Sequence, residues 1–142
     1  MKNRSLRSVL FVSAILVSMA ILAQAQGRGR RQGSPRYDTA SVITVSGMVD
    51  NVNQQTGRTG WSGTHFTLTA TDGTFDVHLG PASFLERQGL KLGNGAQVEV
   101  TGSRVQYNGS DALLAREVKI GDKTFQLRDE KGYPKWSRRS RP

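Results

Sequence analysis

Short runs in which apolar and polar residues alternate limit most strongly what this chain can fold into. The clearest case is "THFTLTATDGTFDVHL", Thr64 to Leu79, which is interrupted by Asp72-Gly73. A period of two places alternate side chains on one face, so the stretch predicts two half-buried β-strands joined by a turn. The apolar members are Phe66, Leu68 and Ala70 before the turn and Phe75, Val77 and Leu79 after it.

The register of this hairpin follows if Asp72-Gly73 forms a two-residue turn. The apolar sets then face each other and form one continuous face, as a buried hairpin requires. The same register places His78 opposite Thr67, with His65 on the diagonal. The apolar pairs would be Ala70 with Phe75, Leu68 with Val77 and Phe66 with Leu79.

Further strand patterns lie on both sides of the hairpin. Gly47, inside the first of them, indicates a bulge or a sharp bend. Between the third strand and the fourth, Pro81 and Gly89 enclose a stretch that predicts a short helix over Ala82–Gln88. Asn94-Gly95 marks a turn, and Gly121-Asp122 joins the last two strands. The additional strands are "SVITVSGMV", "QVEVTGSRVQY", "ALLAREVKI" and "TFQLRD".

This order of elements predicts a mainly β fold, a small five- to six-stranded OB-like Greek-key barrel with one short helix between strands 3 and 4. In such barrels a bent first strand pairs on both sides and closes the sheet. A β-sandwich is the alternative fold, but it would need about seven strands and no helix between the third and fourth.

The first 25 residues have the features of a signal peptide. Basic residues precede an apolar run from Val9 to Leu22, and Ala23-Gln24-Ala25 has small residues at the cleavage positions. The alternative is a membrane anchor, but a span takes ~20 apolar residues and this run is shorter. We therefore expect residues 1–25 to be removed, with a mature chain that starts at Gln26 and is periplasmic or secreted.

The positive charge of the chain lies outside the predicted barrel. Residues 26–37 contain four arginines and residues 131–142 contain five basic residues, with no acid in either segment. Residues 38–130 contain eight basic and eleven acidic residues, a net charge of −3. We expect a basic disordered arm, a barrel domain and a basic C-terminal tail in these three ranges. The tails would be the part that contacts an anionic surface.

Residue types and motifs exclude several chemistries. The chain has no cysteine, so it has no disulfide, no thiolate metal ligand and no covalently attached haem. It contains neither a Gly-x-Ser-x-Gly elbow nor a phosphate-binding P-loop, and its paired carboxylates fit solvated turns. We expect a protein that is not an enzyme and needs no cofactor.

His65, Asp76 and His78 fall on the polar face of the hairpin and form a candidate metal site. Two imidazoles on one face could share an ion with a carboxylate, Asp76 or Asp72, as third ligand. The alternative is that they are solvated polar residues on the outside of a hairpin. His78 has a third candidate role, because its imidazole could form a hydrogen bond at the corner where the strand turns into the helix.

The candidate ligand-binding residues are Arg58, Trp61 and His78. The first two lie in a glycine-rich loop, Asn53 to Thr64, which in barrels of this type borders the ligand face. There an aromatic ring can stack on a base or sugar while Arg pairs with an anion. The alternative for Trp61 is a lid folded over the barrel end. The segment "GYPKW" poses a similar choice, since it could wrap back onto the barrel or hang free.

The pieces "HLGP", "VTGS", "AREV" and "LRDEKGYPKW" resemble a family of small exported bacterial domains, including the domain shared by the magnetosome proteins MamS and MamX. The resemblance covers roughly residues 42–136. It implies a small barrel in the periplasm or in a membrane-bounded compartment continuous with it, and no catalytic residue. The haem-attachment motifs of MamX-type members need cysteine, which this chain lacks.

These observations favour a non-enzymatic exported (periplasmic) OB-like binding or accessory module whose ligand is unknown and whose partner is a protein, a glycan or a metal-handling assembly. One alternative is a polyanion or nucleic-acid binder that uses the Arg-rich tails. A second alternative is a metal-handling domain related to MamS/MamX that uses the histidine pair.

Overall fold

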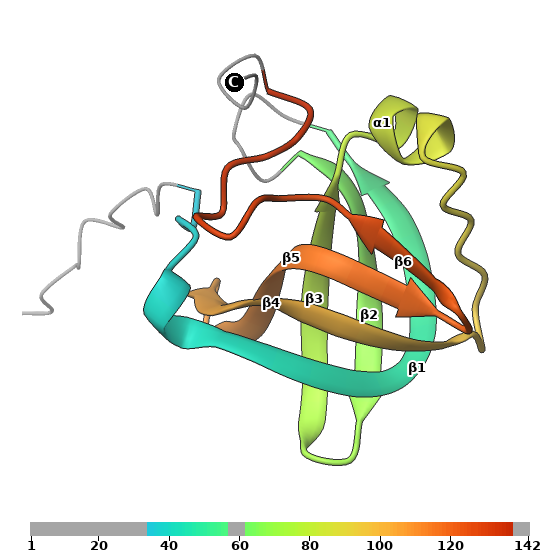
Figure 1. The fold of residues 1–142 in the computed structure, drawn as a ribbon. Helices are drawn as coiled ribbons and strands as arrows, with labels where there is room; N and C mark the ends of the chain where they lie inside the picture. The colour runs from blue at the N-terminus through green and yellow to red at the C-terminus, as the bar shows by residue number, and fades with distance from the viewer. Residues whose placement is uncertain (1–33, 57–61, 138–142) are drawn as a thin grey trace, which may run out of the picture. The chain divides into compact units, whose positions relative to one another are not determined.

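The computed structural model describes residues 34–56 and 62–137, which form a small β-barrel with one α-helix (Figure 1). The elements are η1 (Thr39–Ser41), β1 (Val42–Gln55), β2 (Gly63–Ala70), β3 (Gly73–Gly80), α1 (Ala82–Arg87), β4 (Gln97–Tyr107), β5 (Ser110–Ile120) and β6 (Lys123–Gln126).

Five of the strands close into a barrel. The sheet order is β3-β2-β1-β4-β5-β6, and β3 also pairs with β5 in parallel, which joins the two sides of the sheet. β6 is an additional strand paired antiparallel to β5. Together with α1 between β3 and β4, this topology confirms the predicted OB-like barrel. Closure removes the exposed sheet edges that an open arrangement would leave.

β1 is long because it pairs with a different strand along each half of its length. Its residues 42–48 pair with β4, and residues 48–55 pair with β2. Gly47 lies at this change of partner, where a Cβ atom would collide with the backbone of Thr69. The register shift lies further on, between Asp50 and Asn53, where Asn51 has a positive φ of 48°. The polar end of β1, to Gln55, was expected to be loop and instead pairs with β2.

The predicted register of the β2–β3 hairpin is wrong by two residues. Leu68 pairs with Phe75, and Phe66 pairs with Val77, so Thr71 and Asp72 form the turn. Gly73 begins β3 opposite Ala70, with a φ of 140° that suits glycine. Because side chains alternate with a period of two, a shift of two leaves every residue on its predicted face.

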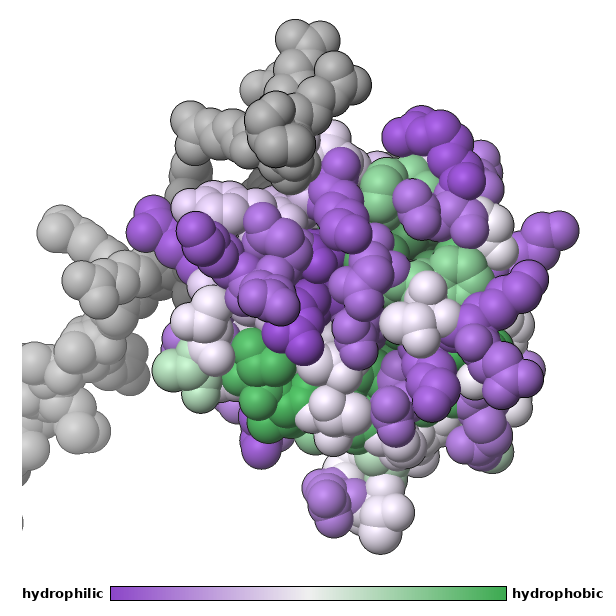
Figure 2. All heavy atoms as spheres, in the orientation of Figure 1, coloured by the Kyte–Doolittle hydropathy of each residue, from purple (hydrophilic) through white to green (hydrophobic). Residues whose placement is uncertain are grey.

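The barrel interior holds the main core, which all five closing strands and α1 line. Leu68, Val77 and Leu79 have no exposed surface, and Phe66 is 1% exposed. A second, smaller cluster lies outside the interior, where Ala112 and Leu114 pack with Tyr37, Val105 and Tyr107. Hydrophilic side chains cover most of the face shown in Figure 2, with hydrophobic surface visible between them.

The chain after β6 folds back onto the barrel, and we call Leu127–Ser137 the C-terminal strap. The backbone amides of Leu127 and Arg128 donate to the Arg116 carbonyl, and the Lys135 amide donates to the Leu127 carbonyl. Trp136 packs against Gly80 and lies 5.4 Å from the ring of Phe84. Of the two alternatives for "GYPKW", the structure therefore shows the one in which it wraps back.

Candidate functional site

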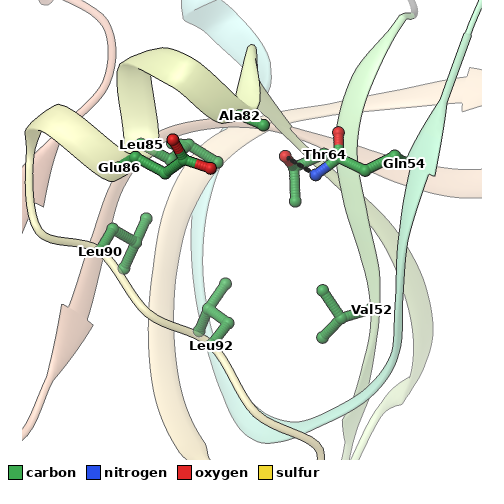
Figure 3. A pocket seen from close by; sticks show the side chains of 8 residues that line it. All are labelled: Val52, Gln54, Thr64, Ala82, Leu85, Glu86, Leu90 and Leu92. Atoms are coloured by element: carbon green, nitrogen blue, oxygen red, sulfur yellow. Dashed lines mark hydrogen bonds between the residues drawn. The ribbon is translucent and has the colours of Figure 1, made fainter.

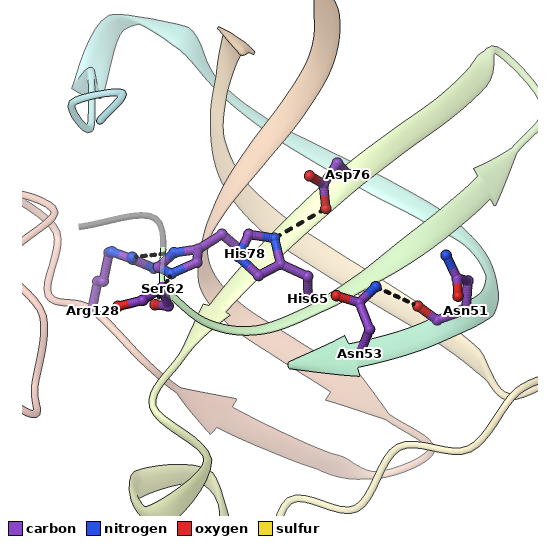
Figure 4. Close-up of polar contacts among 7 residues, drawn as sticks. All are labelled: Asn51, Asn53, Ser62, His65, Asp76, His78 and Arg128. Carbon is purple, nitrogen blue, oxygen red and sulfur yellow. Dashed lines mark hydrogen bonds and ion pairs between the residues drawn. The ribbon is translucent and has the colours of Figure 1, made fainter. Parts of the chain in front are cut away.

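Four side chains form a connected polar row on the outer side of the β2–β3 hairpin: Asp76, His65, His78 and Arg128 (Figure 4). His65 and His78 occupy directly opposite positions on β2 and β3, and their ring centroids are 4.8 Å apart. His65 Nδ1 lies 3.1 Å from an Asp76 carboxylate oxygen. An Arg128 guanidinium nitrogen lies 3.1 Å from His78 Nδ1. We call this set the histidine row.

His78 is held in one protonation state by its partners. Arg128 has only donors, so His78 Nδ1 accepts its hydrogen bond, and Nε2 donates to the Ser62 carbonyl at 3.1 Å. Burial is the main cause that lowers the pKa of His78 to about 4, and the nearby Arg128 charge adds to this. His78 is therefore neutral at pH 7, and it links β3 to the strap and to the start of β2.

The interpretation of these histidines as solvated residues on the solvent-exposed face of a hairpin is wrong. His65 is fully buried and His78 is 2% exposed, whereas the Asp76 side chain is 38% exposed. Arg128, which contacts His78, comes from the C-terminal strap. A local alternation pattern contains no information about a distant segment that covers the strand.

The histidine row gives the metal hypothesis little support. Within the described ranges, no group of three His, Cys, Asp or Glu side chains is placed to hold a metal ion. Both ring nitrogens of His78 are engaged, one by a cation and one by a carbonyl. A metal would need the lone pair that accepts the Arg128 hydrogen bond.

The predicted ligand loop is only partly described. Arg58 and Trp61 lie in residues 57–61, outside the described residues, so the structure does not relate them to His78. The strands that flank this loop contribute to a hollow of about 160 Å³, which we call the α1 hollow (Figure 3). Its apolar lining residues are Val52, Ala82, Leu85, Leu90 and Leu92, and its polar ones are Gln54, Thr64 and Glu86.

The polar side of the α1 hollow is ordered by a hydrogen bond between strands. Gln54 donates from its side-chain amide to the Thr64 hydroxyl at 2.7 Å (Figure 3). This bond bridges the end of β1 and the start of β2, and α1 with its following segment forms the opposite wall. The hollow combines five apolar side chains with three polar ones, two of which are held in place by this hydrogen bond. Apolar walls with a few placed polar groups are typical of a binding pocket.

Sequence reasoning missed Arg128 as a member of the histidine row and left open whether Trp136, which covers it, would reach the barrel. Arg128 is only 4% exposed, donates to the Ala115 carbonyl and lies 4.9 Å from the Trp136 ring centroid. Burial lowers the pKa of Arg128 to about 10, so the group stays charged at pH 7. One signal in the sequence pointed to this packing: Tyr, Pro and Trp are concentrated in "GYPKW", within the segment that was interpreted as a basic tail.

The closed five-stranded barrel with a helix before β4 defines an OB-like domain, and comparison with known sequences identifies its family. The profile of the MamS/MamX magnetosome protein family matches residues 41–125, which span β1 to β6. The chain belongs to this family. The described residues include no helix long and apolar enough to cross a bilayer.

Magnetosome protein MamS of Magnetospirillum gryphiswaldense is a similar protein. It is 26% identical over 106 residues, which cover 73% of this chain and 59% of MamS. The chain thus spans about three fifths of the length of this relative. The match supports the family resemblance that the sequence motifs indicated.

Proposed function

We propose that this protein is an exported, non-enzymatic accessory module of the MamS/MamX type that binds a partner protein at the α1 hollow. The observation that carries the proposal is the hollow itself, which combines five apolar side chains with the hydrogen-bonded Gln54 and Thr64 at the ends of β1 and β2. By analogy with the name of its relative MamS, the partner would belong to a magnetosome or a comparable membrane-bounded compartment.

The size of the α1 hollow indicates what it can take. A volume of about 160 Å³ suits one apolar side chain of a partner and is small for an extended ligand. Burying one such side chain contributes about 1.5–3 kcal/mol, so a stable complex needs further contacts around the rim. Val52, 36% exposed on β1, lies at the hollow and is available for them.

The non-enzymatic part of the proposal is supported by how the histidines are used. His78, the best candidate for acid–base chemistry, has one nitrogen bound to Arg128 and the other to a backbone carbonyl. Neither His65 nor His78 lines the α1 hollow. A general base has to reach the proton that it abstracts, and these rings do not face the site where a ligand would lie.

Substitution of Val52 tests the proposed surface. Val52→Glu places a charge at the hollow, and Met48→Glu is the matched control because Met48 is 46% exposed on the same strand and does not line the hollow. The partner proteins that cross-link to this protein in the exported fraction should be the same for wild type and Met48→Glu. They should no longer cross-link to Val52→Glu. If Val52→Glu retains the same proteins, the α1 hollow is not the docking site.

A second function, polyanion binding through the basic tails, is favoured by where these tails begin. Residues Ser34–Tyr37, the N-terminal stem, pack against the C-terminal strap, because the Tyr37 ring lies against Gly132. Both basic segments therefore start from neighbouring points on the domain. Two basic segments attached at neighbouring points can act jointly on one polyanion, and each neutralised phosphate releases counterions.

Charge neutralisation tests this second function without shortening the chain. Glutamine replaces six tail arginines: Arg28, Arg30, Arg31, Arg138, Arg139 and Arg141. The control replaces three exposed domain lysines, Lys91, Lys119 and Lys123. Binding to DNA and to anionic vesicles should weaken with salt and should be lost only in the tail variant. Equal loss in the lysine control would place the affinity on the barrel.

A further inference from the structure

A second hollow lies between the N-terminal stem and the C-terminal strap, and we call it the stem hollow. Its volume is about 400 Å³. It is formed by two segments far apart in the chain, which meet where Tyr37 packs on Gly132. The β5 residue Leu114 forms part of its wall.

The charge of the stem hollow has one sign. Arg36, Arg128 and Lys131 line it, and no acidic residue does. Three further hollows have acidic residues in their lining: Glu86 lines the α1 hollow, and Glu99 accompanies Lys119 in a hollow formed by β1, β4 and β5. The third lies on the other side of Arg128 and is lined by Glu117, Asp129 and Glu130 as well as by cations. A concave surface lined by cations alone attracts an anion, because its walls focus the field.

Arg128 contributes a buried charge without a carboxylate partner. Within residues 34–56 and 62–137 the ion pairs are His65 with Asp76 and Arg104 with Asp111, so Arg128 belongs to neither. Its guanidinium donates to the Ala115 carbonyl and to His78, and it lies over the Trp136 ring. Buried guanidinium groups are normally balanced by a carboxylate or phosphate, which they can bind in a bidentate manner.

Tyr37 contributes a buried hydroxyl that has no hydrogen-bond partner among the described residues. Burial raises the pKa of this phenol, although Arg116 and Arg128 are near enough to oppose the effect. Arg116 lies beside the hydroxyl but makes no hydrogen bond of ordinary geometry with it. Asp129 is also near and raises the pKa further, so the phenol keeps its proton at pH 7. A protonated phenol without a partner can donate to an acceptor that carries negative charge.

We propose that the stem hollow binds an organic carboxylate. Arg36 and Lys131 at the exposed rim attract the anion, Arg128 in the wall compensates its charge, and the Tyr37 hydroxyl donates to a carboxylate oxygen after a small shift of the stem. Leu114 and Pro134 form apolar walls that suit the carbon stem of the ligand. Such walls disfavour phosphate, which keeps more of its hydration shell.

This site is separate from the α1 hollow, so its failure would leave the proposed function standing. The probes are benzoate, benzyl alcohol as a neutral molecule of the same shape, and inorganic phosphate as an anion without a carbon stem. Their affinities would be measured by titration calorimetry on the protein as cells produce it. Changes in the NMR chemical shifts of backbone amides would locate the site. Benzoate should bind, with shifts at the stem and the strap, and the other two should bind at least tenfold more weakly.

Tyr37→Phe removes only the hydroxyl and should weaken benzoate binding about three- to tenfold. Its melting temperature should stay the same or rise, because a buried donor without a partner is removed. Arg36→Gln with Lys131→Gln should weaken binding further, whereas Lys119→Gln, a control outside this hollow, should leave it unchanged.

Four results would overturn the proposal. Equal binding of benzyl alcohol would mean that charge plays no part, and equal binding of phosphate would mean that the apolar walls do not select the ligand. Full benzoate affinity in Tyr37→Phe would mean that the ligand never reaches the hydroxyl. A fall in the melting temperature of this variant would assign the hydroxyl a structural role instead.

Discussion

Leu68 lies in the barrel interior with no exposed surface, so its removal leaves a cavity that neighbouring strands cannot fill. We expect Leu68→Ala to lower the free energy of unfolding by about 2–5 kcal/mol. Met48→Ala, on an exposed residue, should change it by no more than about 0.5 kcal/mol. Denaturant titration measures both, and equal midpoints for Leu68→Ala and wild type would contradict the core assignment.

His78 should make stability depend on pH. Burial lowers its pKa to about 4 in the folded state, while an unfolded His binds a proton near pH 6.5. Between these values the unfolded state holds more protons, so stability is complete above pH 6.5 and falls as the pH drops toward 4. The shift corresponds to about 3 kcal/mol.

Denaturant titrations at pH 7.5, 6, 5 and 4.5 would measure this loss. His78→Gln keeps hydrogen-bonding groups in place and cannot take up the proton, so its stability should be lower at pH 7.5 but should decline less on acidification. An identical decline in wild type and variant would show that other groups cause the pH dependence.

At the scale of elements, the side-chain contact that holds the strap against β3 is that of Trp136 with Gly80. Gly80 has a φ of 132°, and a Cβ atom there would lie 2.6 Å from the indole ring. The absence of a side chain at Gly80 thus creates the space in which Trp136 lies. The same indole covers Arg128, which in turn holds His78.

Trp136→Ala should release the strap. We expect a loss of about 1–3 kcal/mol, below the value for a fully buried ring because Trp136 is only partly buried. Trypsin should then cleave faster at Lys131 and Lys135, since these side chains are already exposed and local opening frees the backbone around them for the protease. Tyr133→Ala is the control, because Tyr133 is 52% exposed. Unchanged cleavage of Trp136→Ala would mean that the backbone bonds of the strap suffice.

At the scale of the whole molecule, we expect the chain to be exported with cleavage before Gln26. The apolar run that precedes Ala23-Gln24-Ala25 is too short for an anchor. Intact-mass measurement on the periplasmic fraction of the producing cells should give the mass of residues 26–142. A chain that keeps Met1 and stays in the membrane fraction would contradict this prediction.

Most of the architecture followed from local patterns. Phe66, Leu68, Val77 and Leu79 were assigned to the interior, although the register was two residues off, because alternation depends on parity and not on the exact partner. The turn was misplaced because Asp72-Gly73 is a strong hairpin signal, and only the pairing with β1 and β5 decides between neighbouring turns. The polar end of β1 was missed because it contains no alternating apolar residues after Val52, and Asn is a poor strand former.

The sequence by itself determined the order of the strands, five or six of them, the short helix, the core face of β2 and β3, and the family. Each of these depends on spacing within a few residues or on similarity along the chain. Only the tertiary structure decided that His65 and His78 are buried, that Arg128 joins them and that Tyr37 meets Gly132. These contacts connect residues up to 95 positions apart, so they exist only after the barrel has closed and the strap has folded over it.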